Sequence, residues 1–311
     1  MNEPARFRLD NSLERAGLAA QVSSAPGPAA VASPLRRATE WQGFELTLDG
    51  RPSYAKVLQE DMWPVIDPAR SAEASDQAAR AGAAPALLYA DAEQGVLVFE
   101  ALPAGEWRWA RVHELLSGER LEALFSLKRA VHQGAVSGFQ RSPADDIRHL
   151  LWLCQRDAVQ LPLDTDWINA CVDMAWSALA ASGWNSCSIH GDGVASNVML
   201  GPGGQLRLVD FDRGGAFDPW YDVATTLNEL YQLEDEWRLG LEIWAGCCTE
   251  PDYARCRLYA LIDDWLWTLW GLWAGTTSSR SVEFSKVGQW TLLRTREALR
   301  DHRFEHWLRQ V

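Results

Sequence analysis

The sequence lacks the features of a membrane protein and of a general nucleic-acid binder. The apolar stretch that comes closest to a membrane span, residues 265–274, is too short to cross a bilayer and follows two aspartates. The formal net charge is −13, whereas binding to a phosphate backbone requires an excess of lysine and arginine. This acidity favours a cationic or neutral ligand, although the same charge also serves solubility alone.

Cysteine is scarce, and its spacing does not suggest disulfide pairs. Six cysteines occur among 311 residues, none of them in a C-x-x-C pair. Cys247, Cys248 and Cys256 lie close in the chain, but no neighbouring histidine supports a metal site there. The first residues include Glu3 and Asp10 and lack the apolar region of a secretory signal. We therefore expect reduced thiols and a cytoplasmic protein.

The periodicity of the sequence changes about one third of the way along the chain. Residues 1–100 are predicted to form a small lobe. It starts with a helix and linker at 1–34 and continues as strands with one helix. Residues 101–107, ALPAGEW, break the pattern and are predicted to be a hinge. Residues 108–311 are predicted to be mostly helical, apart from a hairpin at 198–209. The expected fold class is α+β, with a small β-rich lobe and a larger helical lobe.

The predicted elements of the small lobe follow from turn signals and alternation. The Asp-Gly pair at 49–50 is a strong hairpin signal, because both residues tolerate a positive φ. The predicted strands are residues 43–48, 54–58, 86–90 and 95–99, and the predicted helix is 68–82.

One short stretch collects carboxylates around a predicted hairpin. SIHGDGVASNVMLGPGGQLRLVDFD begins at Ser188, and its Gly-rich turn folds Asp192, Asn197 and Asp210 onto one patch. Phosphoryl transfer from a nucleotide needs a carboxylate near the attacking hydroxyl and oxygen ligands for Mg²⁺. The stretch therefore predicts a phosphotransferase, with Asp192 as the catalytic base and with Asn197 and Asp210 as metal ligands.

The residues around these three are predicted to support them. His190 is predicted to be structural, with its ring bonded to nearby backbone. Asp218 and Asp222 are predicted to brace the catalytic loop through helix capping or backbone hydrogen bonds. Asp212 has two open interpretations, because it either binds a second metal ion or caps the following loop.

The stretch resembles the catalytic segment of the aminoglycoside phosphotransferase and choline kinase families. The resemblance lies in the HGD sequence that ends at Asp192, in Asn197 and in the DFD sequence that starts at Asp210. Residues 218–224, DPWYDVA, are similar to the segment that follows in those families. The resemblance implies a bilobal protein-kinase-like fold, ATP and Mg²⁺ as cofactors, and a small hydroxylated acceptor.

The resemblance extends to the small lobe, where it implies the nucleotide-binding residues. Lys56 in YAKVL matches the strand lysine that holds the phosphates, and Glu73 matches the helix glutamate that pairs with it. The backbone of Glu100 and Leu102, in VFEAL, matches the linker that binds adenine.

The phosphate-covering loop departs from the families that the chain resembles. It is expected within residues 35–44, LRRATEWQGF, which contain only Gly43 where relatives carry more small residues. We expect Arg36, Arg37 and Thr39 to contact the phosphates by charge and hydroxyl instead. A nucleotide-binding pseudokinase is therefore an alternative to the enzyme.

Tryptophan is abundant, with 17 residues, and three tryptophans follow one another at three-residue steps in DDWLWTLWGLW. Trp267, Trp270 and Trp273 either line a ligand site or pack in a core helix. The WGLW sequence and Glu283 resemble the choline and ethanolamine kinases, which implies a pocket for a cationic amino group. Trp290 stands where that family has tyrosines, and the expected acceptor is a small amino alcohol similar to choline or ethanolamine. The alternative acceptor is an aminoglycoside antibiotic, and the sequence does not specify the oligomeric state.

Overall fold

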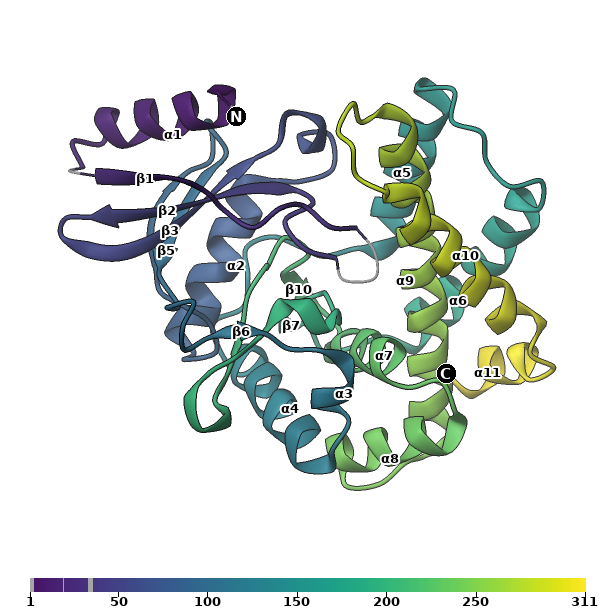
Figure 1. The fold of residues 1–311 in the computed structure, drawn as a ribbon. Helices are drawn as coiled ribbons and strands as arrows, with labels where there is room; N and C mark the ends of the chain where they lie inside the picture. Colours follow the sequence, from purple (N-terminus) through teal and green to yellow (C-terminus); the bar gives the residue numbers. More distant parts are fainter. Residues whose placement is uncertain (1–2, 19, 33–35) are drawn as a thin grey trace.

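The protein has two lobes, and helices make up most of the larger one (Figure 1). The computed structural model describes residues 3–18, 20–32 and 36–311. The small lobe is a five-stranded sheet in the order β1-β2-β3-β5-β4, in which every neighbouring pair is antiparallel. Asp49 and Gly50 have positive φ and form the predicted turn between β2 and β3. The strands are β1 (Ala20–Pro26), β2 (Trp41–Leu48), β3 (Arg51–Leu58), β4 (Leu87–Asp91) and β5 (Val96–Glu100).

Helices cover both faces of this sheet. On one face, α1 (Glu3–Arg15) buries Ala5, Leu9 and Leu13, which are spaced four residues apart and form a small core with β2, β3 and β5. On the other face, α2 (Pro68–Arg80) contributes to the main core of the protein. The linker predicted up to residue 34 is corrected, because β1 lies within it. Backbone pairing with β2 forms this edge strand, and composition does not reveal such pairing.

The large lobe is built around the long helix α9 (Glu250–Thr277), most of which is buried. It packs against α5, α6, α7, α10 and α11. No helix in the described part of the chain is long and apolar enough to cross a membrane. The other helices are α3 (Val112–Leu115), α4 (Gly118–His132), α5 (Pro143–Arg156), α6 (Thr165–Ser182), α7 (Pro219–Leu230), α8 (Glu234–Ala245), α10 (Phe284–Arg300) and α11 (Phe304–Gln310).

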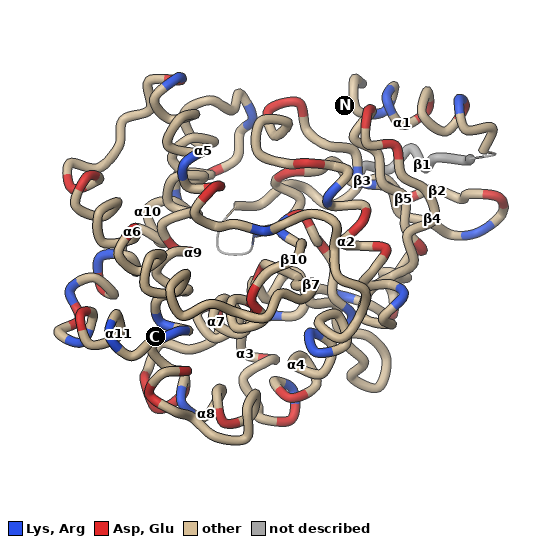
Figure 2. Tube along the Cα trace, turned by 180° about the vertical axis from the view of Figure 1, so that it is seen from behind, with Lys and Arg blue, Asp and Glu red and all other residues tan. Residues whose placement is uncertain are grey.

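Short strands between α6 and α7 carry the predicted catalytic stretch. The predicted hairpin is confirmed as β8 (Val198–Leu200) and β9 (Leu206–Leu208), and β6 (Arg108–Trp109) joins them in a three-stranded sheet. A second pair, β7 (Cys187–Ile189) and β10 (Gly215–Phe217), flanks the stretch. Figure 2 shows acidic and basic segments on both lobes, and α8 and α11 each carry both signs.

Candidate active site

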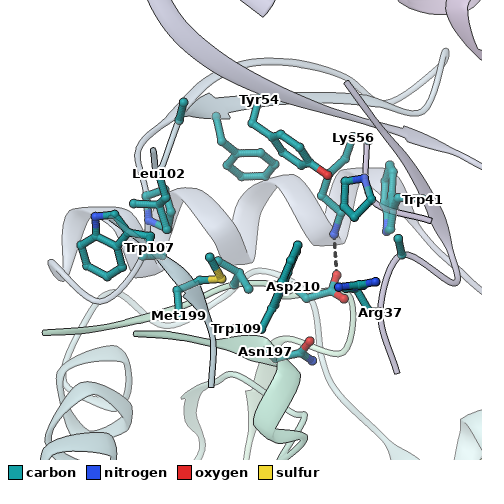
Figure 3. A pocket seen from close by; sticks show the side chains of 18 of the residues that line it. Arg37, Trp41, Tyr54, Lys56, Leu102, Trp107, Trp109, Asn197, Met199 and Asp210 are labelled. Atoms are coloured by element: carbon teal, nitrogen blue, oxygen red, sulfur yellow. Dashed lines mark hydrogen bonds and ion pairs between the residues drawn. The ribbon is translucent and has the colours of Figure 1, made fainter. Parts of the chain in front are cut away.

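A cavity of about 500 Å³ lies between the lobes. Leu102, Trp107 and Met199 gather at the end next to residues 101–107, whereas Lys56 and Asp210 lie at the opposite end (Figure 3). This volume is typical of small-molecule sites. The polarity suits an elongated ligand with an apolar ring at one end and an anionic group at the other.

The ring end of the cavity offers backbone and aromatic contacts. Glu100 and Leu102 both line it, and the N–H of Leu102 makes no backbone hydrogen bond with any described residue. Our sequence predictions missed Trp107 and Trp109, which also line the cavity. Their W-x-W spacing was an overlooked signal, because alternate residues of an extended segment share one side. Tyr54 was missed as well, and it lies across the cavity from Trp109 (Figure 3).

The predicted phosphate loop, residues 35–44, differs from the structure at its C-terminal end. Leu35 lies outside the described residues, and β2 already begins at Trp41. Gly43 is a strand residue whose absent Cβ leaves room for Tyr54, since a Cβ there would lie 1.9 Å from the Tyr54 hydroxyl. Thr39 is fully buried, and its hydroxyl donates to Glu40. The structure therefore turns Thr39 toward a neighbouring side chain, not toward the cavity.

Lys56 points from β3 toward the aspartates of the catalytic stretch. Its Nζ lies 2.5 Å from Asp210 Oδ1 and 4.0 Å from Asp212 Oδ1. Burial alone would lower the pKa of Lys56, but these carboxylates hold it above its ordinary value. Asp210 has a φ of 69°, a strained conformation of the kind that occurs at functional sites. Lys56 thus stays charged at the polar end of the cavity.

The predicted pair between Lys56 and Glu73 is corrected. Glu73 instead accepts hydrogen bonds from Gln77 Nε2 at 3.0 Å, Ser137 Oγ at 2.9 Å and the Gly138 N–H at 2.6 Å. These partners tie α2 to the loop before α5. Glu73 therefore joins the two lobes. The carboxylate beside Lys56 is that of Asp210 and not that of Glu73.

The polar end of the cavity holds the oxygen donors that suit Mg²⁺. Asn197, at the end of a short 3₁₀ turn, and Asp210 both line the cavity. Asp212 Oδ2 accepts a hydrogen bond from Trp41 Nε1 at 2.5 Å. Its other oxygen, Oδ1, is the atom that could bind a metal ion. Burial raises the pKa of Asp212 to about 7, against the opposing effect of Lys56. Mg²⁺ usually takes one or two carboxylates and completes its shell with phosphate oxygens and water, so this donor set fits.

The buried carboxylate of Asp222 holds the backbone of the catalytic loop in place. Its carboxylate accepts the N–H groups of His190 at 2.9 Å and Gly191 at 2.7 Å, and it also contacts Lys128 at 3.3 Å and His132 at 2.9 Å. Burial alone would raise the pKa of Asp222, but Lys128 and His132 hold it well below its ordinary value. Our sequence predictions missed Lys128, although a lysine within the apolar stripe of α4 was a signal. The buried ion pair holds the loop in one conformation.

Two further residues also belong to this support. His190 is buried, its Nε2 lies 3.0 Å from the Val209 carbonyl oxygen, and burial lowers its pKa. Asp218 caps α7 by accepting the Trp220 N–H at 3.0 Å and is held by the Tyr259 hydroxyl at 2.6 Å. Both contacts keep the segments on either side of the catalytic stretch in place.

Asp192 belongs to this loop, and its carboxylate faces Arg36 of the small lobe. It is 8 % exposed, and its Oδ1 accepts the Val194 N–H at 3.0 Å. Its other oxygen forms an ion pair with Arg36, whose Cζ lies 3.4 Å from the centroid of a Trp267 ring. The guanidinium predicted to contact phosphate is therefore held by the predicted catalytic base. Arg36 and Arg37 both line the nucleotide-sized cavity, and Arg37 lies over the Trp109 ring.

Of the three tryptophans expected in the acceptor site, Trp267 is the one whose ring contacts Arg36, the ion-pair partner of Asp192. Trp270 is fully buried and packs edge-on against Phe284 with ring centroids 5.5 Å apart. Trp273 is also buried, and its Nε1 donates to Asp157 Oδ2 at 2.8 Å. The assignment of Trp270 and Trp273 to the ligand site is thus corrected, because the three-residue step rotates their rings into the core. Glu283 is exposed and pairs with Lys286 at 2.6 Å.

Further acids act on Arg36, among them the buried Asp263 and the half-buried Glu229. The Tyr221 hydroxyl donates to Asp263 Oδ1 at 2.5 Å, and burial together with Asp192 and Asp264 raises the pKa of Asp263 to about 7. Burial likewise raises the pKa of Glu229, whose Oε1 accepts the Ala195 N–H at 3.3 Å. Our sequence analysis missed Glu229, and its position on α7 gave no separate signal.

The two-lobed fold, the strand lysine and the catalytic loop between the lobes define a small-molecule kinase of the protein-kinase-like fold. The chain belongs to the phosphotransferase enzyme family, because the model of that family matches residues 33–259. A search of curated protein sequences found no match.

Solved structures support the same fold. A choline/ethanolamine kinase family protein from Mesorhizobium loti is similar with a TM-score of 0.75 and 21 % identity, over 99 % of this chain and 98 % of that one. The choline kinase LicA from Streptococcus pneumoniae follows with 0.72 and 15 %, over 94 % and 97 %. The spectinomycin phosphotransferase APH(9)-Ia has 0.55 and 11 %, over 94 % and 93 %. At these identities the similarity establishes the fold, and both acceptor classes occur among the neighbours.

Proposed function

We propose that this protein transfers the γ-phosphoryl group of ATP to a hydroxyl group of a small cationic metabolite of the amino alcohol class. The observation that carries the proposal is the position of the Arg36 guanidinium, which is bound by Asp192 and lies on Trp267. A cation therefore already occupies the space in front of the proposed catalytic base. An ammonium group of the acceptor would find the same partners there.

The nucleotide would occupy the cavity between the lobes. Its base would lie beside Leu102 and Trp107, and its phosphates beside Lys56. Structures of two similar proteins, LicA with AMP and the spectinomycin phosphotransferase with ADP, support nucleotide binding in this fold. Asn197 and Asp210, with Asp212 nearby, would hold Mg²⁺, which would neutralise part of the phosphate charge.

Asp192 would orient the acceptor hydroxyl and accept its proton as the oxygen attacks the γ-phosphorus. The bond from that phosphorus to the β–γ bridging oxygen breaks, and ADP leaves. A positioned carboxylate contributes roughly 10²–10⁴-fold to such a reaction. The hydrogen bonds from His190 and Gly191 to Asp222 keep the loop, and so Asp192, at a fixed place.

Charge and ring contacts support a cationic acceptor. Asp192 is a buried acid whose ion-pair partner Arg36 lies on the Trp267 ring, and the face of such a ring attracts cations. An acceptor cation that enters would take over the contacts of Arg36. All six cysteines are free, as is usual in a reducing compartment, so we propose that the reaction takes place in the cytoplasm.

A panel of acceptors with ATP and Mg²⁺ tests the proposal by ADP release and by mass of the product. Ethanolamine, choline and longer amino alcohols are compared with neutral polyols and aminoglycosides. We expect phosphorylated product with the amino alcohols and the lowest KM within that group. Turnover restricted to aminoglycosides or to neutral polyols would contradict the proposed acceptor, and ATP binding without any product would contradict the proposed reaction.

A further inference from the structure

Three arginines gather beside the acceptor side of the cleft, although the protein is strongly acidic overall. Arg141 immediately precedes α5, Arg213 follows the DFD sequence, and Arg70 lies near the start of α2. Arg141 is 3 % exposed and Arg213 is 5 % exposed, while Arg70 is half-buried. Arginine is rarely buried unless it is paired, so the partners of these three groups need an explanation.

Backbone packing brings the three arginines together. A Cβ on Gly214 would lie 2.6 Å from the Cβ of Ala74, which shares one face of α2 with Arg70. A Cβ on Gly215 would lie 3.3 Å from the Cβ of Arg141. The glycines after Arg213 therefore let this segment pass closely between α2 and the start of α5.

One carboxylate serves this arginine cluster directly. Asp146 forms an ion pair with Arg141, and its Oδ2 lies 3.7 Å from Arg213 Nη1. The Tyr221 hydroxyl lies 3.5 Å from Arg141 Nη2 and adds a neutral partner. Within the described residues, the Nε atoms of all three arginines and Nη2 of Arg213 are buried without a hydrogen-bond partner. Buried hydrogen-bond donors are normally paired, so these guanidinium groups can bind a further group that accepts hydrogen bonds.

The other nearby acids do not balance the cluster. Asp67 caps α2 by accepting backbone N–H groups, and Asp263 is bonded to the Tyr221 hydroxyl and has a pKa raised by burial to about 7. Burial lowers the pKa of Arg141 to about 10, and the charges of Arg213 and Arg70 act in the same direction. Within the described residues, Asp146 forms the ion pairs of the cluster, whereas Asp67, Asp263 and Glu40 act on its arginines only through longer-range charge effects.

The cluster adjoins the proposed acceptor site through one ring. Arg213 Cζ lies 5.0 Å from the centroid of the Trp267 ring, the ring that also contacts Arg36. We propose that Arg70, Arg141 and Arg213 bind an oxyanion carried by the acceptor, a carboxylate or a phosphate, while the acceptor's hydroxyl faces Asp192. The acceptor is then an amino alcohol that also carries such an oxyanion, which narrows the class named in the proposed function. Arginine forks match such oxyanions in geometry as well as in charge.

Direct binding is tested with inorganic sulfate and the full chain, in saturating nonhydrolysable ATP analogue and Mg²⁺ so that the nucleotide cavity is filled. We expect sulfate to raise the melting temperature in a saturable way, and chloride at equal ionic strength not to do so. Arg213→Gln should weaken sulfate binding at least about tenfold. Arg148→Gln, at an exposed arginine of the same helix as Asp146, should leave it unchanged. Sulfate no more effective than chloride, or equal effects of both variants, would overturn the oxyanion site.

A second variant keeps the test decisive if Arg213→Gln does not fold. Asp146→Asn removes the internal carboxylate that competes for the same guanidinium groups. We expect tighter sulfate binding in this variant. Unchanged or weaker sulfate binding by folded Asp146→Asn would show that the cluster is only structural.

The inference rests on the proposed function, so acceptor pairs must separate the two. L-serine is compared with ethanolamine, L-homoserine with 3-amino-1-propanol, and glycerol 3-phosphate with glycerol; each pair differs by one anionic group. We expect kcat/KM to favour the anionic member by about tenfold or more, either in the two carboxylate pairs or in the phosphate pair. Arg213→Gln should remove that preference. The type that is favoured distinguishes carboxylate from phosphate.

The outcomes for the two proposals differ. Turnover that favours the member without the anion in every pair would overturn the oxyanion site and leave the cationic amino alcohol proposal standing. If no acceptor is turned over despite nucleotide binding, the proposed reaction fails, and the sulfate titration still decides whether the cluster binds an oxyanion.

Discussion

Arg36 and Asp192 lie 156 positions apart in the sequence and form a buried ion pair in the cleft. The pair joins the segment before β2 to the catalytic loop, and the Ser196 hydroxyl donates to the Arg36 carbonyl oxygen beside it. The proposed catalytic base is therefore engaged by a residue of the opposite lobe. Acceptor binding and the position of Arg36 must then be linked, because both require the same carboxylate.

Replacement of this arginine should favour the acceptor. We expect Arg36→Ala to lower the KM of a cationic acceptor about three- to tenfold, since the acceptor no longer competes with an internal ion pair and ring contact. The affinity for nucleotide, measured by calorimetry, should change less than about twofold. Arg51→Ala, at an exposed residue of β3, is the control. A marked loss of nucleotide affinity in Arg36→Ala would instead assign the residue to the phosphates.

Asp192→Asn should abolish most catalysis without loss of nucleotide binding. We expect kcat to fall by roughly 10²–10⁴-fold, because the amide cannot accept the proton of the hydroxyl. Single-turnover rates and nucleotide affinity are measured on the same preparation. A variant that keeps wild-type kcat would rule out Asp192 as the base.

Trp267 and Trp270 should differ in function although they are close in sequence. Trp267→Leu should raise the acceptor KM by about 3- to 30-fold, because the ring face that binds a cation is lost. Trp270→Leu should change that KM less than Trp267→Leu does, because Trp270 supports the Trp267 ring from 5.1 Å away without contacting Arg36. It should lower the free energy of unfolding by about 2–4 kcal/mol, because it opens a cavity beside Phe284. Equal KM effects would contradict the assignment of Trp270 to the core.

Asp222→Asn should destabilise the whole protein. The variant leaves the Lys128 ammonium buried without its carboxylate, for which we expect a loss of about 3–5 kcal/mol in the free energy of unfolding. Asp235→Asn, at an exposed position of α8, should change it by less than about 0.5 kcal/mol. Urea titrations of wild type and both variants measure the free energy of unfolding. If Asp222→Asn lowers it no more than Asp235→Asn does, Asp222 does not stabilise the catalytic loop.

Asp263 should make stability depend on pH. Its pKa is about 7 in the folded protein, whereas an unfolded aspartate has a pKa of about 3.9. Between these values the unfolded chain is ionised while the folded protein keeps the proton, so stability falls as pH rises from about 4 to 7. Tyr221, Asp192, Asp264 and Arg36 are the groups that act on it.

The variant Asp263→Asn isolates this contribution. Relative to wild type, it should gain roughly 2–4 kcal/mol in the free energy of unfolding between pH 4 and pH 8. Urea titrations at both pH values measure the gain. Parallel pH profiles for the two proteins would show that Asp263 does not titrate in this range.

The sequence predicted the elements that have strong local signals. The Asp-Gly turn at 49–50 located β2 and β3, and the Gly-rich turn located the hairpin that carries Asn197 and Asp210. Edge strand β1 was missed, because its pairing with β2 uses backbone groups that any sequence carries. Glu73 was assigned its partner from the resemblance to known families, yet it bonds to the loop before α5.

The residue types and spacing of the catalytic stretch alone predicted that carboxylates and an amide would lie on one patch, because a short hairpin allows few other arrangements. Only the tertiary structure decided what each group contacts. Packing of α9 turned Trp270 away from the cleft, close backbone approach at Gly214 and Gly215 gathered three arginines, and the lobes brought Arg36 to Asp192. Contacts between distant segments depend on how whole elements pack, and no local pattern encodes that packing.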